Sequence, residues 1–162
     1  VGNESDRALF VTFTEQGVPL ASDQTTVEKN LAMKVDYSDM AGAAVDVSSL
    51  PQGTGFLMTV SVTNGTFRQI GNIALTQMVP SGWEIQNTWL FEESSYDYRD
   101  FRDDRVYTYF SLKSGETKKF IILLTASYRG TYAMPAVVCE AMYDDGVRAR
   151  RPGREVTVTE AK

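Results

Sequence analysis

The chain has 162 residues, of which 43% are hydrophobic and 23% charged, and its formal net charge is −5. Length and composition indicate one globular domain, and the acidic balance argues against a general binder of nucleic acid or anionic membranes. The chain has no histidine and one cysteine, Cys139, which excludes an internal disulfide, Ser-His and Cys-His catalytic pairs and histidine-ligated zinc.

The first half of the chain alternates in a way that predicts strands. Residues 8–14 are rich in β-branched and aromatic side chains and predict a leading strand. Polar residues follow at 22–29 and read as a linker. We therefore expect residues 1–25 to carry a leading strand that belongs either to this fold or to the remnant of a preceding domain. The main domain is expected over residues 26–162. Leu31 to Ser38 alternates cleanly and predicts a half-buried strand.

The strongest strand pattern is Phe56 to Thr63, where large apolar side chains alternate with smaller ones. Asn64-Gly65 follows it and predicts a hairpin turn, because both residues tolerate positive φ. Lys118 to Ala126 is apolar on both faces, which is typical of a central strand. Further strands are predicted over residues 72–79, 83–90, 130–138 and 156–159.

The most individual stretch runs from Tyr96 to Leu112. Residues 97–105 interleave acids and bases so that neither face is apolar, which predicts an edge strand or loop rich in local ion pairs. From Val106 onward alternate residues are apolar and predict a buried strand. We predict that the polar part contacts a neighbouring domain through aromatic anchors. The predicted contact residues are Tyr96, Tyr98, Arg99, Phe101, Arg102, Asp103, Asp104 and Arg105.

No segment places apolar residues at helical spacing, and turns separate the predicted strands throughout. The pattern predicts an all-β fold, an antiparallel β-sandwich of about seven to nine strands of the immunoglobulin or fibronectin type. The chain begins at Val1 without an initiator methionine, so we expect it to be a piece of a longer protein. No apolar run approaches the roughly 20 residues that span a bilayer, so direct membrane insertion is not expected.

Four ordered segments resemble the C-terminal part of bacterial alpha-2-macroglobulins. They are ALTQMVPSGWEI (74–85), YRDFRDDRV (98–106), YRGTYAMP (128–135), and EAMYD with VRAR (140–150). The leading LFVTFTEQGVP (9–19) also resembles the family. The resemblance implies a macroglobulin-like, receptor-binding-like β-sandwich without catalytic activity or cofactor.

In the family that this chain resembles, a protease cuts a bait region and a thioester domain then bonds the protease covalently. The resemblance implies that this domain packs near the thioester domain and helps to hold the resting state. Its partners would be other domains of the parent chain and, through the parent, target proteases. The thioester motif Cys-x-x-Gln is missing, because Glu140, Ala141 and Met142 follow Cys139. The expected location is the periplasm or cell envelope, within a membrane-anchored lipoprotein.

The alternative function is a carbohydrate- or adhesion-type binding module of a cell-envelope protein. Its platform would be the aromatic residues Trp83, Trp89, Tyr96 and Tyr98, although tryptophans near strand ends more often pack into the rim of the core. A calcium site is the sharper interpretation of the acids Glu92, Glu93, Asp97, Asp100, Asp103 and Asp104. These acids lack the spacing of a calcium loop, and neighbouring arginines compete for them, so an ion-paired edge is favoured.

Two smaller features also allow more than one interpretation. Arginines gather around Pro152-Gly153, but the negative net charge and the lack of interleaved aromatic residues disfavour a phosphate or nucleic-acid site. A solvated turn, or a complement to acidic neighbours, is favoured for Arg148, Arg150, Arg151 and Arg154. Cys139 is expected to be a buried, inert thiol.

Overall fold

The computed structural model describes residues 6–8, 10–12, 14, 25–86 and 95–161. Within these ranges the chain forms thirteen strands and no helix, so none of this part forms a helix that could cross a membrane. The strands are β1 (Val27–Lys29), β2 (Leu31–Ser38), β3 (Ser49–Pro51), β4 (Gly55–Asn64), β5 (Ile70–Met78), β6 (Trp83–Gln86), β7 (Tyr98–Phe101), β8 (Arg105–Leu112), β9 (Thr117–Ala126), β10 (Gly130–Met134), β11 (Val137–Ala141), β12 (Asp144–Arg151) and β13 (Arg154–Thr159).

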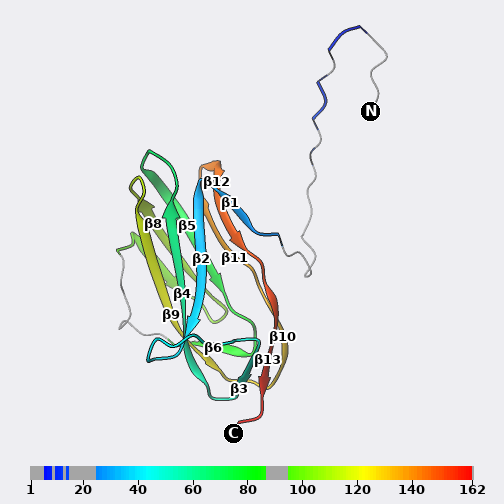
Figure 1. Ribbon diagram of the computed structural model, residues 1–162, viewed down its shortest axis with the longest axis vertical. Coiled ribbons are helices and arrows are strands. Elements are labelled where there is room, and N and C mark those ends of the chain that lie inside the picture. Colours follow the sequence, from blue (N-terminus) through cyan, green and yellow to red (C-terminus); the bar gives the residue numbers. More distant parts are fainter. Residues whose placement is uncertain (1–5, 9, 13, 15–24, 87–94, 162) are drawn as a thin grey trace.

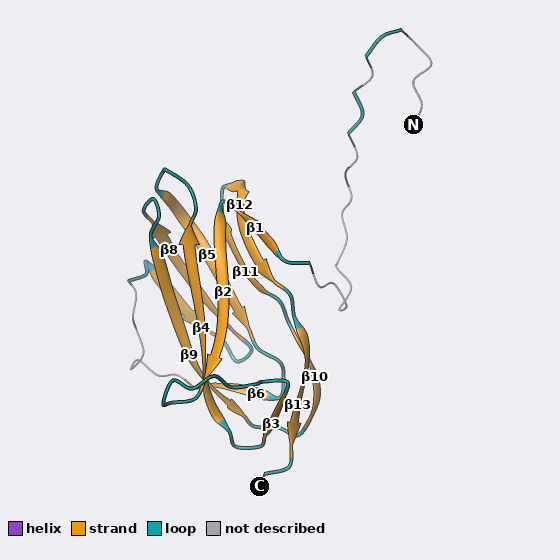
Figure 2. Ribbon diagram, viewed as in Figure 1, coloured by secondary structure: helices purple, strands orange, loops and turns teal. Residues whose placement is uncertain are grey.

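The strands build a sandwich of two main sheets with a small third sheet at one end (Figures 1 and 2). The larger sheet has the order β1-β12-β11-β5-β8-β7, the facing sheet β2-β4-β9-β6, and the small sheet β10-β13-β3. The paired strands in these sheets are antiparallel except β13 and β3, which run parallel. The predicted all-β antiparallel sandwich is confirmed, with thirteen strands in place of about seven to nine.

Alternation predicted the long strands well because each buries one face. β2 has the predicted bounds, and β4 and β8 extend the predicted alternation by a residue at their ends. β9 is central in its sheet, between β4 and β6, as its apolar character predicted. The core lies between the two main sheets, where the Phe110 and Phe120 rings pack at a tilt with their centroids 4.5 Å apart.

The predicted leading strand is wrong for the residues that the structure describes there. Residues 8, 10–12 and 14 form no strand, and the Phe10 side chain is exposed. β-branched residues alone do not produce a strand, because the backbone N–H and C=O groups of an unpaired segment bond to water and not to a neighbouring strand. The division of the chain at residue 25 stays a prediction.

The predicted hairpin at Asn64-Gly65 is also wrong. β4 pairs with β2 and β9, whereas β5 pairs with β8 and β11, so this connection passes from one main sheet to the other. Neither residue has positive φ. The buried Asn64 side chain instead organises the connection, accepting from Thr66 N–H (2.8 Å) and donating to Arg68 C=O (2.7 Å).

The strand predicted over residues 130–138 is divided in two at Pro135. β10 lies in the small sheet and β11 in the larger one, and β12 and β13 are divided in the same way at Pro152-Gly153. The two connections touch: a Cβ on Gly153 would lie 2.0 Å from the Met134 carbonyl oxygen. Only glycine fits such a close approach of two backbones.

β12 was not predicted, because its arginines were assigned to a turn. In the structure three of the four lie in this strand, and the exposed Arg148 alternates with buried Val147 and Ala149. Arg151 forms an ion pair with Glu28, as a complement to an acidic neighbour. The turn itself is limited to Pro152 and Gly153.

Candidate functional site

The predicted contact segment forms a hairpin at the edge of the larger sheet. β7 pairs with β8 and is the outermost strand of that sheet, so the predicted edge is confirmed. The strands are joined at Asp103 and Asp104, and Arg102 N–H donates to Arg105 C=O (2.8 Å) to close the loop. The Asp104 carbonyl accepts from Val79 N–H (2.9 Å), which fixes the loop to the end of β5.

One group of side chains on this hairpin faces outward. Tyr98 lies opposite Tyr109, and Asp100 lies opposite Tyr107, so these four side chains share the outer face of the sheet. The Tyr98 side chain is 60% exposed, and its ring centroid lies 6.0 Å from that of Tyr109. The outer face of the hairpin therefore presents a small aromatic surface to solvent.

A second group faces the interior. Arg99 lies opposite the fully buried Thr108, and its Nη2 donates to the Ile121 carbonyl on β9 (2.9 Å), which belongs to the facing sheet. Its guanidinium lies 5.0 Å from the Phe101 ring centroid and 5.9 Å from that of Tyr96. Both rings pack partly buried against the core. These three residues hold the hairpin on the sandwich.

Local ion pairs brace the loop, as predicted. Both Arg102 Nε and Nη2 lie 2.9 Å from the Asp100 carboxylate, and Arg105 holds Asp104 through two contacts of 2.9 and 2.6 Å. The hydrogen bonds from Arg105 hold the pKa of the Asp104 carboxyl below its usual value. Exposed pairs of this kind add little to stability, so we assign them to the shape of the loop. Asp103 is exposed at its tip.

The structure gives little support to the sharper interpretations of this region. Among the described residues no group of three or more acidic or cysteine side chains is placed to hold a metal ion, and Glu92 and Glu93 lie outside them. Trp83 is buried beside Phe56, with ring centroids 4.9 Å apart, so it cannot join an exposed aromatic platform. Trp89 lies outside the described residues.

Cys139 is fully buried on β11, which confirms the predicted buried thiol. Desolvation by burial, with a smaller contribution from the charge of Glu140, raises the pKa of this thiol well above its usual value. A protonated thiol is a poor nucleophile, so Cys139 is not suited to covalent chemistry.

Sequence reasoning missed an exposed apolar tip at one end of the sandwich. Phe67 lies fully exposed on the β4–β5 connection, and Met142 and Tyr143 lie exposed on the β11–β12 connection. An ion pair of 2.9 Å between Arg68 and Asp144 joins the β4–β5 connection to the start of β12. The available sequence indication was an aromatic residue, Phe67, set among turn residues where no strand periodicity would bury it.

Together these features define an antiparallel β-sandwich domain whose most organised polar surface is a braced edge hairpin. Residues 27–145 match the family described as the bacterial alpha-2-macroglobulin MG10 domain. The chain therefore belongs to this family and is a domain of a bacterial alpha-2-macroglobulin-like protein. The resemblance seen in the sequence is confirmed.

Several relatives and solved structures are similar to this chain. An alpha-2-macroglobulin of Xylella fastidiosa is 25% identical, over 96% of this chain and 10% of the relative. The structure of Salmonella alpha-2-macroglobulin reacted with methylamine is 23% identical, with TM-score 0.74 over 83% of this chain and 10% of that one. Trypsin-activated Escherichia coli alpha-2-macroglobulin is 19% identical, with TM-score 0.74 over 82% and 10%. The chain thus spans about a tenth of the length of the curated relatives it matches.

Proposed function

We propose that this chain is a non-catalytic interaction domain of a protease trap and that it packs against a neighbouring domain, such as the thioester domain, through the β7–β8 hairpin. Family membership supports the trap, because the E. coli relative has a trypsin-activated form and the Salmonella relative a methylamine-reacted form. The parent protein would act in the periplasm or cell envelope as a membrane-anchored lipoprotein. Target proteases would be met by the parent and not by this domain alone.

The interdomain contact is inferred from one observation: some side chains of the hairpin face inward and hold it on the sandwich, whereas Tyr98 faces outward. Arg99 and Phe101 fasten it from inside, so the exposed Tyr98 is held in place above Tyr109 before any partner arrives. An aromatic side chain that is already ordered loses little conformational entropy on binding, which favours it as an anchor. In this contact Tyr98 is the anchor, and the two ion pairs of the hairpin loop form its polar rim.

The test uses limited proteolysis of the longer parent protein in its resting state. Tyr98→Ala should loosen the contact and raise the rate at which the parent is cleaved at domain junctions. The matched control is Tyr143→Ala, because Tyr143 is also exposed but lies on the β11–β12 connection, two strands away from the hairpin. Equal cleavage rates for both variants and the unaltered parent would sink the proposed contact.

The trap itself is tested separately by the intact mass of the parent before and after methylamine, with a count of free thiols. Methylamine opens a thioester, so a working trap should gain the mass of one methylamine and expose one thiol. Cys139 should not contribute, because it is buried. A parent that neither reacts nor retains protease would contradict the trap, whatever the outcome for Tyr98.

A further inference from the structure

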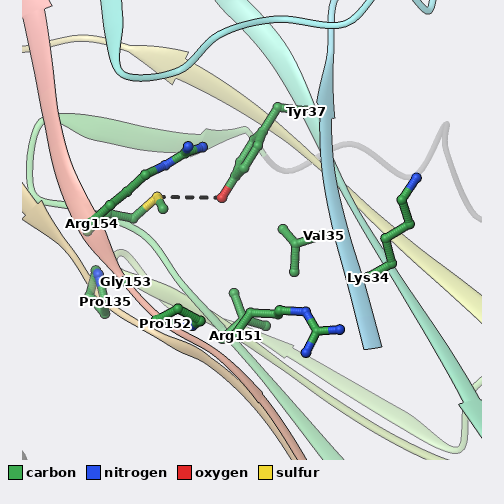
Figure 3. A pocket seen from close by; sticks show the side chains of 10 residues that line it. Lys34, Val35, Tyr37, Pro135, Arg151, Pro152, Gly153 and Arg154 are labelled. Atoms are coloured by element: carbon green, nitrogen blue, oxygen red, sulfur yellow. Dashed lines mark hydrogen bonds between the residues drawn. The ribbon is translucent and has the colours of Figure 1, made fainter. Parts of the chain in front are cut away.

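A cleft of about 340 Å³ opens on one side of the sandwich, between β2 and the two connections that cross at Pro135 and Gly153. Figure 3 shows Val35 and Tyr37 on one wall and the two connections on the other. The Tyr37 hydroxyl donates to the Met134 sulfur (3.5 Å) across the cleft. Burial raises the pKa of Tyr37 to about 12, so this hydroxyl stays a neutral donor.

The cleft exposes residues that belong to the core face of β2. Leu31 and Met33 are each 2% exposed, but Val35 and Tyr37, which share their face, are only half-buried. The cover is lost because the opposite strands leave the larger sheet at the crossing connections. The result is an apolar floor that the chain does not fill.

The backbone of β2 is open at the same place. β2 is an edge strand, and two contacts show which residues turn their backbone away from β4: Met33 N–H donates to Glu28 (3.1 Å), and Tyr37 C=O accepts from Val45 N–H (3.0 Å). Backbone groups alternate in direction along a strand, so those of Val35 also point away from β4, into the cleft it lines. The described hydrogen bonds leave this N–H and C=O available to pair with another strand.

The charged side chains that line the cleft are all cations, although the whole chain carries −5. Its lining includes Lys34, Arg151 and Arg154 and no acid. The guanidinium of Arg154 lies 5.6 Å from the Tyr37 ring centroid, above the apolar floor. Arg151 forms an ion pair with Glu28 and Lys34 one with an acid on its own strand. Arg154 interacts with the charge of Asp46 from a greater distance, so it is the cation best placed to meet an incoming carboxylate.

We propose that this cleft binds a short extended segment of another polypeptide, which adds to the edge of β2 at Val35, buries apolar side chains on the exposed floor and places a carboxylate on Arg154. A free strand edge supplies main-chain pairing, and a pocket for alternate side chains supplies selectivity. Only the backbone groups around Val35 are open, so the paired stretch is about three residues long. This binding site is independent of the hairpin contact proposed above.

The probe is the peptide acetyl-Glu-Val-Glu-Val-Glu-amide, titrated into the ¹⁵N-labelled chain while backbone amide shifts are recorded. Binding should move the amide resonances of Val35 and Tyr37 most, with a dissociation constant of about 0.1–1 mM because few main-chain bonds form. Affinity should fall as salt is raised. A peptide with lysine in place of glutamate should bind at least about tenfold more weakly, because it meets Arg154 with like charge.

Three controls separate strand pairing from simple attraction of charges. The same peptide N-methylated at its three central residues has lost its pairing donors and should not bind. Val35→Pro removes the Val35 N–H donor without breaking a bond to β4, and a proline is tolerated at such an edge position. Arg154→Gln should weaken binding roughly fivefold to tenfold, whereas Arg129→Gln, an exposed arginine paired with Glu160 outside the cleft, should not. Thermal unfolding of each variant checks that it folds, and Arg154→Gln decides the matter if Val35→Pro does not.

Three results would overturn the proposal. The first is no shift at Val35 and Tyr37 at millimolar peptide. The second is equal binding by the N-methylated or lysine peptide. The third is self-association that competes with the peptide as protein concentration rises, because a second copy of the chain would then be the occupant.

Discussion

The two open sides of the sandwich are closed by different contacts, although on each side an arginine points inward from the larger sheet. At the β7 side Arg99 reaches the facing sheet directly and donates to the Ile121 carbonyl. At the β12 side Arg151, which lies opposite the buried Val137, pairs with Glu28. Glu28 in turn accepts from Met33 N–H on β2.

The difference follows from the groups that each open edge presents. A guanidinium has only donors, so it can satisfy a carbonyl such as that of Ile121 without help. A guanidinium cannot accept a hydrogen bond from an N–H. The Glu28 carboxylate therefore accepts from both the Met33 N–H and the Arg151 guanidinium. The first side is sealed with Arg99 and two aromatic rings, and the second is held at one point and opens into the cleft beyond it.

Of the substitutions that test this comparison, one at the crossing of the two connections beside the cleft should lower stability most. Gly153→Ala would place a methyl group 2.0 Å from the Met134 carbonyl oxygen, and backbone on both sides limits relaxation. We expect a loss of about 3 kcal/mol or more in the free energy of unfolding, measured with urea. Gly55→Ala is the matched control, with open space around it and an expected change of about 1 kcal/mol or less. A tolerated Gly153→Ala would show that the crossing is not tightly packed.

The sealed side is tested by Arg99→Met, which keeps much of the side-chain volume but removes the donor to the Ile121 carbonyl. Leaving that carbonyl unsatisfied should cost about 1–3 kcal/mol in urea unfolding. Arg102→Met is the control, because Arg102 makes an exposed ion pair and should change stability by about 0.5 kcal/mol or less. Equal effects for the two variants would contradict the sealing role of Arg99.

On the other side, the stability contributed by the Arg151–Glu28–Met33 contacts should depend on pH. Hydrogen bonds from Arg151 and from the Met33 amide hold the pKa of the Glu28 carboxyl below its usual value. Because the folded pKa is the lower one, the stabilisation is present above the unfolded pKa and is lost as pH falls through the folded value. Glu28→Gln should therefore lose less stability than the unaltered chain on acidification from neutral pH to about pH 3. Glu160→Gln, at an exposed pair with Arg129, should follow the unaltered chain in the same unfolding series.

The smallest effect concerns how readily each side opens. Cys139 is buried on β11, a strand closer to the cleft side than to the β7 side, so its reaction with a thiol reagent reports local opening. In the native chain it should react only at the rate of opening. We compare how much each substitution raises this rate of reaction, after correcting for the global stability that the variant loses. On that scale Arg151→Met should raise the rate several-fold more than Arg99→Met. The reverse order would make the β7 side the weaker one.

The sequence predicted the strands whose own residue pattern is sufficient to identify them. β2, β4 and β8 each bury one face, so their alternation fixes both their existence and their inward residues. β1 and β3 escaped prediction because each is three residues long and owes its pairing to β12 and β13, far along the chain. The change of sheet at Pro135 is likewise invisible in a strand pattern that continues across it.

The candidate hairpin was half predictable. Alternating acids and bases gave the exposed, ion-paired edge, because such a stretch cannot be buried on either face. Which residues point inward was not predictable, since it depends on the register with β8 that places Arg99 opposite Thr108. The cleft could not be foreseen at all, because it arises where two connections cross and not from any single segment.

The position of β13 has a consequence for synthesis. Among the described strands β3 pairs only with β13, and Ser49 meets Thr157 across that parallel pair. A growing chain that has released β2, β4 and β9 can already form the sheet they share, but β3 must wait for β13, which lies more than a hundred residues beyond β3 in the sequence. Contacts of such long sequence separation are slow to form, so the small sheet is the last part of the domain to be completed.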